Sequence, residues 1–397
     1  MKIWYNTGDC KMRKEATKYK ISTFIRYVGD AFIYPFLALY LKSIGLENKD
    51  VGLIMMILPL VAIFINPIWS TLSKNINSNR IFIRVLTIIE AIAVVILVNV
   101  GANVWLIALV IFIIGVSGQP FYILFDSYTV TFSKLENYEY SKIRIFGSVA
   151  YAFTVFFSGI IAAYNYKLAF YIGASSFVLT SVIITWIKPL DFNLDQELVH
   201  KAEPKKLFKN KKYWCYAILV TLTLTTMFTF DTYVPIYLED IYGVNAMYYG
   251  FIVSAYIFIE LIILFILGRV GKRIPNIYLY LAMIISLVIR YGIYALSGVV
   301  EVPLWSIIMV TMLRSIPISV SIYMMMNMIV KLVEPYNVTI ATIIMGSIRS
   351  IFSTVLVLFG GFLTNNPTNY KYWFLIGVGF SILALAFIDY KNSVKVE

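Results

Sequence analysis

Long apolar runs separated by short polar segments dominate the chain. Stretches such as LIMMILPLVAIFI and LIALVIFIIGV are continuously apolar, whereas the strands of a membrane β-barrel alternate apolar and polar side chains. A helix of about 20 such residues crosses a bilayer, so the pattern predicts twelve membrane-spanning α-helices. They are expected at 17–44, 49–74, 79–99, 103–133, 138–163, 167–187, 213–240, 245–269, 275–297, 303–333, 337–363 and 370–390.

The polar segments divide these helices into two groups of six. Most linkers are short, and the exception is the lysine-rich stretch 188–212. It predicts an N-terminal six-helix bundle at 1–187, a basic cytoplasmic linker at 188–212 and a C-terminal six-helix bundle at 213–397. The expected fold class is therefore an all-α membrane protein.

The two halves share sequence features in the same order. GSVAYAF, which begins at Gly147, resembles GSIRSIF, which begins at Gly346, at an offset of 199 residues. Pro120 likewise corresponds to Pro317, at an offset of 197 residues. A chance match of a few Gly and Pro residues is the alternative, but the nearly constant offset favours duplication. Such repeats predict two pseudo-symmetric bundles with a substrate site between them.

Composition agrees with a membrane protein. Hydrophobic residues make up 60% of the chain, charged residues 14%, and the mean hydropathy is +0.81, whereas an average soluble domain is about 25% charged. A soluble chain could not bury so much apolar side chain, and a disordered chain needs low hydrophobicity. Both classes are therefore excluded.

The positive charges indicate an orientation. With the N-terminus inside, the great majority of the 33 Lys and Arg residues fall in the inside segments, and this bias places both termini in the cytoplasm. The first twenty residues lack the apolar core and cleavage site of a signal peptide. The net charge of +12 is then an orientation signal, and no nucleic-acid partner is needed to explain it. The expected location is the cell membrane.

Catalytic and cofactor motifs are missing from the sequence. It holds no HExxH, GxSxG, P-loop or Cys/His cluster, and its one histidine, His200, lies in the central linker. The sequence therefore predicts neither an enzyme nor a bound metal or cofactor. Uphill transport by such a chain must draw on an ion gradient.

Ionisable residues inside the predicted spans are the best candidates for function, because charge in the bilayer interior is costly. Arg26 and Asp30 are spaced i,i+4 and can pair within one helix. Asp126 and Arg144 lie at matched depth on consecutive helices. A structural ion pair is the alternative reading for each. The remaining candidates of this kind are Glu90, Asp231, Glu260, Arg290, Arg314 and Arg349.

The two-times-six layout resembles the major facilitator superfamily. RIFGSVAYA at 144–152, with Asp126 eighteen residues before it, is similar to the lactose-permease-like branch of oligosaccharide and nucleoside:proton symporters. The resemblance implies that Asp126 and Arg144 bind substrate hydroxyls and that Tyr151 stacks on the sugar ring. A carboxylate and a guanidinium are strong hydroxyl partners, and an aromatic face suits a pyranose, although core packing would also explain Tyr151.

Other positions keep or lose the features of that branch. Arg349 stands where the family has a lysine that pairs with an aspartate, so the resemblance implies a structural Asp231–Arg349 pair. Met312 and Ser315 replace the family's proton-coupling His and Glu. The carboxylates left for proton coupling are Glu260, Asp30 and Glu90, and removal from water favours the neutral, protonated form of such groups.

Together these features predict a secondary transporter that works by alternating access. The expected cargo is a small polar organic solute, of sugar or nucleoside type, imported with protons by a monomer in the lipid bilayer. One rival is an efflux antiporter for amphipathic compounds on the same fold, because the 14 Met residues give adaptable surfaces. A rival of another class is a membrane receptor or scaffold that does not transport.

Overall fold

The computed structural model describes residues 7–72, 76–190, 204–334 and 338–388. All secondary structure in these residues is helical, which confirms the expected all-α class. Much of the predicted linker 188–212, with His200, lies outside the described residues, so the predicted domain division at that linker stays a prediction.

Eleven helical segments of the described chain are long and apolar enough to cross a membrane, which makes the protein a multi-pass membrane protein. They are Lys14–Ser43, Asn48–Trp69, Val104–Leu135, Ser141–Tyr164, Tyr166–Trp186, Lys211–Tyr242, Ala246–Arg273, Asn276–Leu296, Leu304–Met325, Ile340–Thr364 and Pro367–Phe387. The span expected at 79–99 is the helix α5 (Ile76–Leu97), which contains three charged residues, Arg80, Arg84 and Glu90. Twelve crossings and the cytoplasmic termini therefore stay predictions.

Contacts divide the described chain into two units, which cut across three helices. The first comprises residues 7–40, 64–190 and 246–251, and the second comprises residues 41–63, 204–245 and 252–388. The divided helices are α2 (Leu37–Ser43), α4 (Ile57–Leu72) and α12 (Ala246–Val270).

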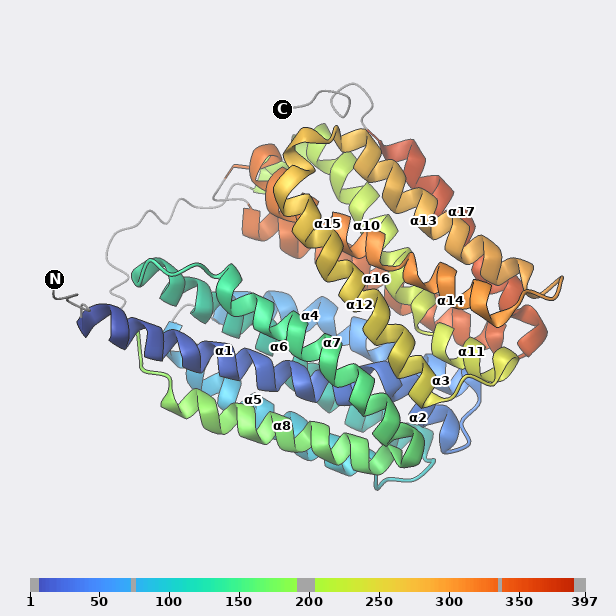
Figure 1. Cartoon of the computed structure of the whole chain (residues 1–397), viewed down its shortest axis with the longest axis horizontal. Helices are drawn as coiled ribbons and strands as arrows, with labels where there is room; N and C mark the ends of the chain where they lie inside the picture. Colours follow the sequence, from blue (N-terminus) through green and yellow to red (C-terminus); the bar gives the residue numbers. More distant parts are fainter. Residues whose placement is uncertain (1–6, 73–75, 191–203, 335–337, 389–397) are drawn as a thin grey trace, which may run out of the picture. The chain divides into compact units, whose positions relative to one another are not determined.

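The first unit is built from five long helices, which lie side by side in Figure 1. Helix α1 packs against α7 and α8, and α5 packs against α6 and α8. Asn103 and Asn165 cap α6 and α8 by accepting hydrogen bonds from their first backbone N–H groups. The helices other than α5 are α1 (Thr7–Ile33), α6 (Val104–Leu135), α7 (Ser141–Tyr164) and α8 (Tyr166–Trp186), with η1 (Tyr34–Phe36) after α1.

The core of the first unit near the start of α1 is aromatic. Tyr19 stacks on Phe132 with 4.3 Å between ring centroids, and Phe121 stacks on Phe125 at 5.1 Å. All four side chains are buried, and the contact of Tyr19 on α1 with Phe132 on α6 fixes the rotation of α6 against α1. That rotation decides which polar residues of the two helices face each other.

The second unit has a similar aromatic core. Trp373 is fully buried and stacks on Phe230 at 4.1 Å, and this contact joins α17 to α10. Helix α13 packs on α17, and α16 packs on both α10 and α3. The helices are α3 (Asn48–Met55), α9 (Pro204–Lys209), α10 (Lys211–Asp231), α11 (Val234–Tyr242), α13 (Asn276–Leu296), α14 (Leu304–Met312), α15 (Ser315–Leu332), α16 (Val338–Thr364) and α17 (Tyr370–Leu383), with short 3-10 turns η2 (Gly271–Arg273), η4 (Pro367–Asn369) and η5 (Ala384–Phe387).

Candidate functional site

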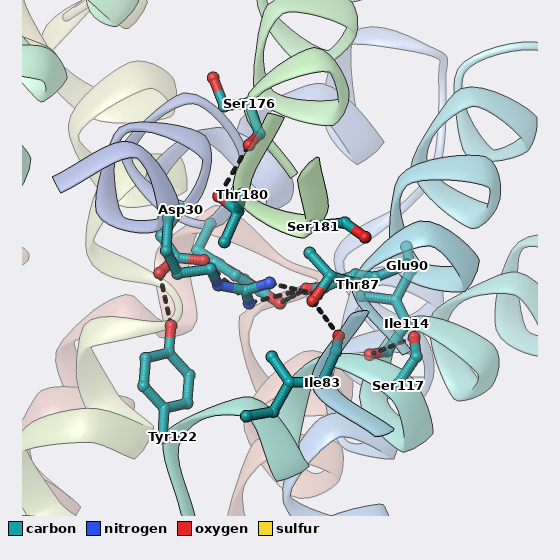
Figure 2. Close-up of polar contacts among 12 residues, drawn as sticks. Asp30, Ile83, Thr87, Glu90, Ile114, Ser117, Tyr122, Ser176, Thr180 and Ser181 are labelled. Carbon is teal, nitrogen blue, oxygen red and sulfur yellow. Dashed lines mark hydrogen bonds and ion pairs between the residues drawn. The ribbon is translucent and has the colours of Figure 1, made fainter. Parts of the chain in front are cut away.

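Arg26 of α1 forms ion pairs with two carboxylates in the first unit, those of Asp30 and Glu90, which are labelled in Figure 2. Its Nη2 is 3.1 Å from Oδ1 of Asp30, one helical turn further along α1. Its Nη1 forms an ion pair with Oε2 of Glu90 on α5, and Nη2 also donates to Oε1 of Glu90 at 2.9 Å. We call Arg26, Asp30 and Glu90 the acid-rich cluster, because it carries one net negative charge when all three groups are ionised.

The acid-rich cluster is sealed from solvent. Arg26 and Glu90 are 0% exposed and Asp30 is 2% exposed. The ring of Phe177 lies 4.1 Å from the guanidinium carbon of Arg26 and that of Phe121 lies 4.6 Å from it, so cation–π contacts replace water around the cation. The i,i+4 spacing predicted the Arg26–Asp30 pair.

Two tyrosine hydroxyls complete the hydrogen bonds to the carboxylates. Tyr122 of α6 donates to Oδ2 of Asp30 at 2.5 Å, and Tyr34 of η1 donates to Oε1 of Glu90 at 2.9 Å. Oδ1 of Asp30 has no hydrogen-bond partner of good geometry in the described residues. Asp30 is therefore less completely satisfied than Glu90.

Two threonine hydroxyl groups near the cluster are turned toward backbone carbonyls (Figure 2). Thr87 donates to the carbonyl of Ile83 at 2.5 Å, and Thr180 donates to that of Ser176 at 2.8 Å. A hydroxyl proton used in this way cannot solvate a carboxylate. These neighbours therefore leave the negative charge uncompensated.

The second unit holds a cluster of the opposite sign. Asp231, at the end of α10, accepts an ion pair from Nη1 of Arg290 on α13 at 2.7 Å and another from Nε of Arg314, just before α15, at 2.7 Å. Tyr291 also donates to its Oδ1 at 3.1 Å. We call Asp231, Arg290 and Arg314 the arginine-rich cluster. Arg290 follows Glu90 of the first unit by 200 residues, so a cation stands where the other half has an anion.

The structure does not pair Asp231 with Arg349, contrary to the prediction. Both carboxylate oxygens of Asp231 are taken by Arg290 and Arg314. Arg349 of α16 instead lies over the ring of Phe228, with its guanidinium carbon 5.5 Å from the ring centroid. The rotation of each helix about its axis decides which arginines reach Asp231, and a sequence motif does not specify that rotation.

Asp126 and Arg144 approach each other without forming an ion pair in the described residues. Oδ1 of Asp126 accepts a hydrogen bond from Tyr140 at 2.9 Å. The guanidinium carbon of Arg144 lies 4.8 Å from the ring centroid of Tyr27, and its Nη1 is buried with no hydrogen-bond partner. Tyr140 precedes the candidate span, and burial, reinforced by Asp126, raises the pKa of its phenol, which keeps the hydroxyl a donor. Tyr151 lies two turns further along α7 and is half-buried.

Glu260 is the third proton-coupling candidate. It belongs to α12 in the second unit, is half-buried, and interacts electrostatically with Arg314. Within the first unit, Asp30 and Glu90 are brought together by Arg26. Within the described part of the chain, no group of three or more His, Cys, Asp or Glu residues could hold a metal ion.

Comparison with known families decides the class of protein. The model of the MFS_1 like family matches residues 16–365. The chain belongs to the MFS_1 like family. This membership confirms the resemblance to the major facilitator superfamily, whose proteins are transporters and not enzymes.

Relatives of the chain are distant in sequence. The uncharacterized transporter YwbF of Bacillus subtilis is 24% identical over 58% of this chain and 58% of its own length. The lactose permease of Klebsiella oxytoca is 21% identical over 67% of this chain and 69% of its own length. The match to YwbF thus spans less than two thirds of that relative.

Solved structures share the fold. The nucleoside transporter NupG superposes with a TM-score of 0.76 at 16% identity, covering 94% of this chain and 98% of NupG. At that identity the likeness shows the arrangement of helices alone.

Proposed function

We propose that this protein is a secondary transporter of the cell membrane that imports a small polar organic solute together with protons. The acid-rich cluster is the observation that carries the proposal. Two carboxylates share one arginine in a buried site, and an uncompensated charge there is costly. Uptake of one proton would neutralise the cluster, and its release would restore the charge.

Asp30 is the better proton carrier of the pair. Glu90 receives two N–H groups of Arg26 and the hydroxyl of Tyr34, and a bidentate guanidinium strongly favours the ionised carboxylate. Asp30 keeps one oxygen without a hydrogen-bond partner of good geometry. A proton therefore has the lowest cost on Asp30, and Glu260 is the alternative carrier.

The solute contacts that we propose are Asp126, Arg144 and Tyr151. The buried Nη1 of Arg144 has no hydrogen-bond partner in the described residues, and a solute hydroxyl would satisfy it. Tyr151 follows on the same helix with a ring that can stack on a sugar or a base. The names of the lactose permease and nucleoside transporter relatives support a solute of sugar or nucleoside type.

The test is the external pH of a lightly buffered, anaerobic suspension of cells that express the protein. Sugars and nucleosides are added one at a time, and proton-coupled import makes the medium alkaline. The Arg144→Ala variant should lose this response although it is still expressed. Acidification of the medium when solute is added, which indicates exchange of solute for protons, or a full response in Arg144→Ala, would contradict the proposal.

The Asp30→Asn variant tests the proton carrier. It should still exchange labelled for unlabelled solute across a membrane at equilibrium, because the solute contacts are intact, but should no longer accumulate solute in response to a pH gradient. Asp50→Asn, a change of the same type at the first turn of α3, is the control. Accumulation by Asp30→Asn equal to that of the unmodified protein would exclude Asp30 as carrier.

A further inference from the structure

The interior of the second unit has an excess of positive charge. Counting only described residues at least six positions from both ends of a candidate span, it holds three arginines, Arg290, Arg314 and Arg349, and two carboxylates, Asp231 and Glu260. With all five ionised, the excess is one positive charge. Such a charge in a membrane interior needs a counter-ion.

Arg349 is the cation without a carboxylate. No ion pair joins it to any described residue, and its contact is with the face of Phe228. Asp231, the partner that the family resemblance implies for Arg349, already forms ion pairs with Arg290 and Arg314. Arg349 is half-buried rather than sealed, so its guanidinium donors can be reached by a bound molecule.

Arg314 stands on the same aromatic ring as Arg349. Its guanidinium carbon is 5.9 Å from the centroid of Phe228 and 4.5 Å from that of Tyr256. Arg314 gives only its Nε to Asp231, so the four N–H bonds on its two terminal nitrogens stay available. The guanidinium carbons of Arg314 and Arg349 are therefore separated by at most the sum of their two distances to the centroid of the Phe228 ring.

Arg290 is excluded from the same role by its burial. It is 1% exposed, it lies against the rings of Tyr291 and Tyr294, and its Nε donates to the hydroxyl of Tyr294. It therefore holds Asp231 in place, whereas Arg314 and Arg349 are only half-buried.

We propose that Arg314 and Arg349 bind an anionic group of the transported solute, a carboxylate or a phosphate. Planar guanidinium groups match both anions in charge and geometry, and one bound monovalent anion would cancel the excess charge. The inference rests on the proposed transport function, since it adds an acidic group to the sugar-like or nucleoside-like solute.

Binding by the purified full-length protein tests this inference separately from transport. Thermal unfolding in detergent is followed with matched acid and neutral probes: galacturonate with galactose, glucuronate with glucose, and uridine monophosphate with uridine, all at equal ionic strength. At least one acid should raise the unfolding temperature more than its neutral partner. The Arg349→Gln variant should weaken that acid roughly ten- to hundred-fold, the usual loss for one charge-assisted contact.

Two further variants separate anion binding from damage to the fold. Arg349→Lys keeps the charge and should retain part of the affinity. Arg269→Gln removes an exposed arginine that also lies over a ring, that of Phe265 at 4.1 Å, and should leave binding unchanged. Equal weakening in Arg269→Gln would show a general charge effect and overturn the assignment.

Other ligands distinguish a site for the acidic group of the solute from a site for a free anion. Stabilisation by chloride or inorganic phosphate as strong as by the acid probes would place a free anion at the site and overturn its assignment to the solute. No stabilisation by any acid, or equal affinity of Arg349→Gln, would overturn the anion site itself. If Arg349→Gln transports a neutral solute as well as the unmodified protein does, the proposed function stands and the anion site is overturned. If an acid binds at Arg349 but no solute is taken up, the anion site stands and the proposed function is overturned.

Discussion

At the scale of single residues, each unit places one charge between two of the opposite sign. Arg26 forms ion pairs with Asp30 and Glu90, and Asp231 forms ion pairs with Arg290 and Arg314. Removing the central residue of such a group leaves two like charges facing each other in a low dielectric. The resulting loss of stability is larger than the net stabilisation by the intact group, because the remaining charges stay desolvated without a partner of opposite sign.

Arg26→Gln should therefore destabilise the protein by about 3–5 kcal/mol, and the double change Arg26→Gln with Glu90→Gln should recover part of that loss. The measurement is thermal unfolding of the purified variants in detergent. Lys142→Gln, which removes the cation of an exposed i,i+3 pair with Glu139, is the control and should stay near the unmodified protein. An additive double variant would show that Arg26 and Glu90 do not interact.

Sequence reasoning reached part of this arrangement. The Arg26–Asp30 pair follows from helical periodicity alone. Glu90 was a candidate by its unexpected charge, but its partner depends on how α5 is rotated against α1, which packing of the surrounding rings sets. The same limitation explains the wrong Asp231–Arg349 pair, since Arg290 and Arg314 reach Asp231 from other helices.

At the scale of elements, the apolar runs located the helices but not their breaks. The span predicted at 17–44 is interrupted by η1, where Pro35 removes a backbone donor. The span predicted at 213–240 is divided before Pro235 into α10 and α11. The span predicted at 303–333 breaks at Leu313 and Arg314 between α14 and α15. Hydropathy is insensitive to such breaks, because it is averaged over a whole span and the residues on both sides are mostly apolar.

Close helix contacts in the second unit depend on glycine. A Cβ atom on Gly361 of α16 would lie 2.7 Å from the carbonyl oxygen of Asn48 and 2.8 Å from Cα of Gly52 on α3. Asn48 reinforces this crossing by donating to the carbonyl of Thr364 at 2.8 Å. Backbone atoms cannot move aside as a flexible side chain can, so the two helices must separate to admit a methyl group.

Gly361→Ala should thus lower the stability of the protein by about 1–3 kcal/mol, the usual cost of overpacking. Gly346→Ala on the same helix is the matched control, because an added Cβ there meets nothing within 4 Å. It should be neutral or stabilising by up to about 1 kcal/mol, since alanine favours the helix. Thermal unfolding of the two variants side by side checks the difference, and equal effects would refute the close crossing.

At the scale of the whole molecule, the two halves have diverged in charge while keeping their layout. The acid-rich cluster carries one excess negative charge and the second unit one excess positive charge. The proposed proton neutralises the first and the proposed anion neutralises the second. One proton and one monovalent anion carried together have no net charge, so a complete cycle would move no charge across the membrane.

Accumulation of an acid probe should accordingly respond to a pH gradient and not to the membrane potential. Proteoliposomes are loaded with potassium, and valinomycin sets an interior-negative potential without a pH difference. The acid that stabilises the protein should not accumulate under this potential, whereas an alkaline interior should drive its accumulation. A membrane potential of 100 mV is worth about 2.3 kcal/mol per elementary charge, so a cycle that carried one net positive charge inward would concentrate the probe many-fold. Such concentration would refute one-to-one coupling of the proton and the anion, while a neutral solute carried with the same proton should show it.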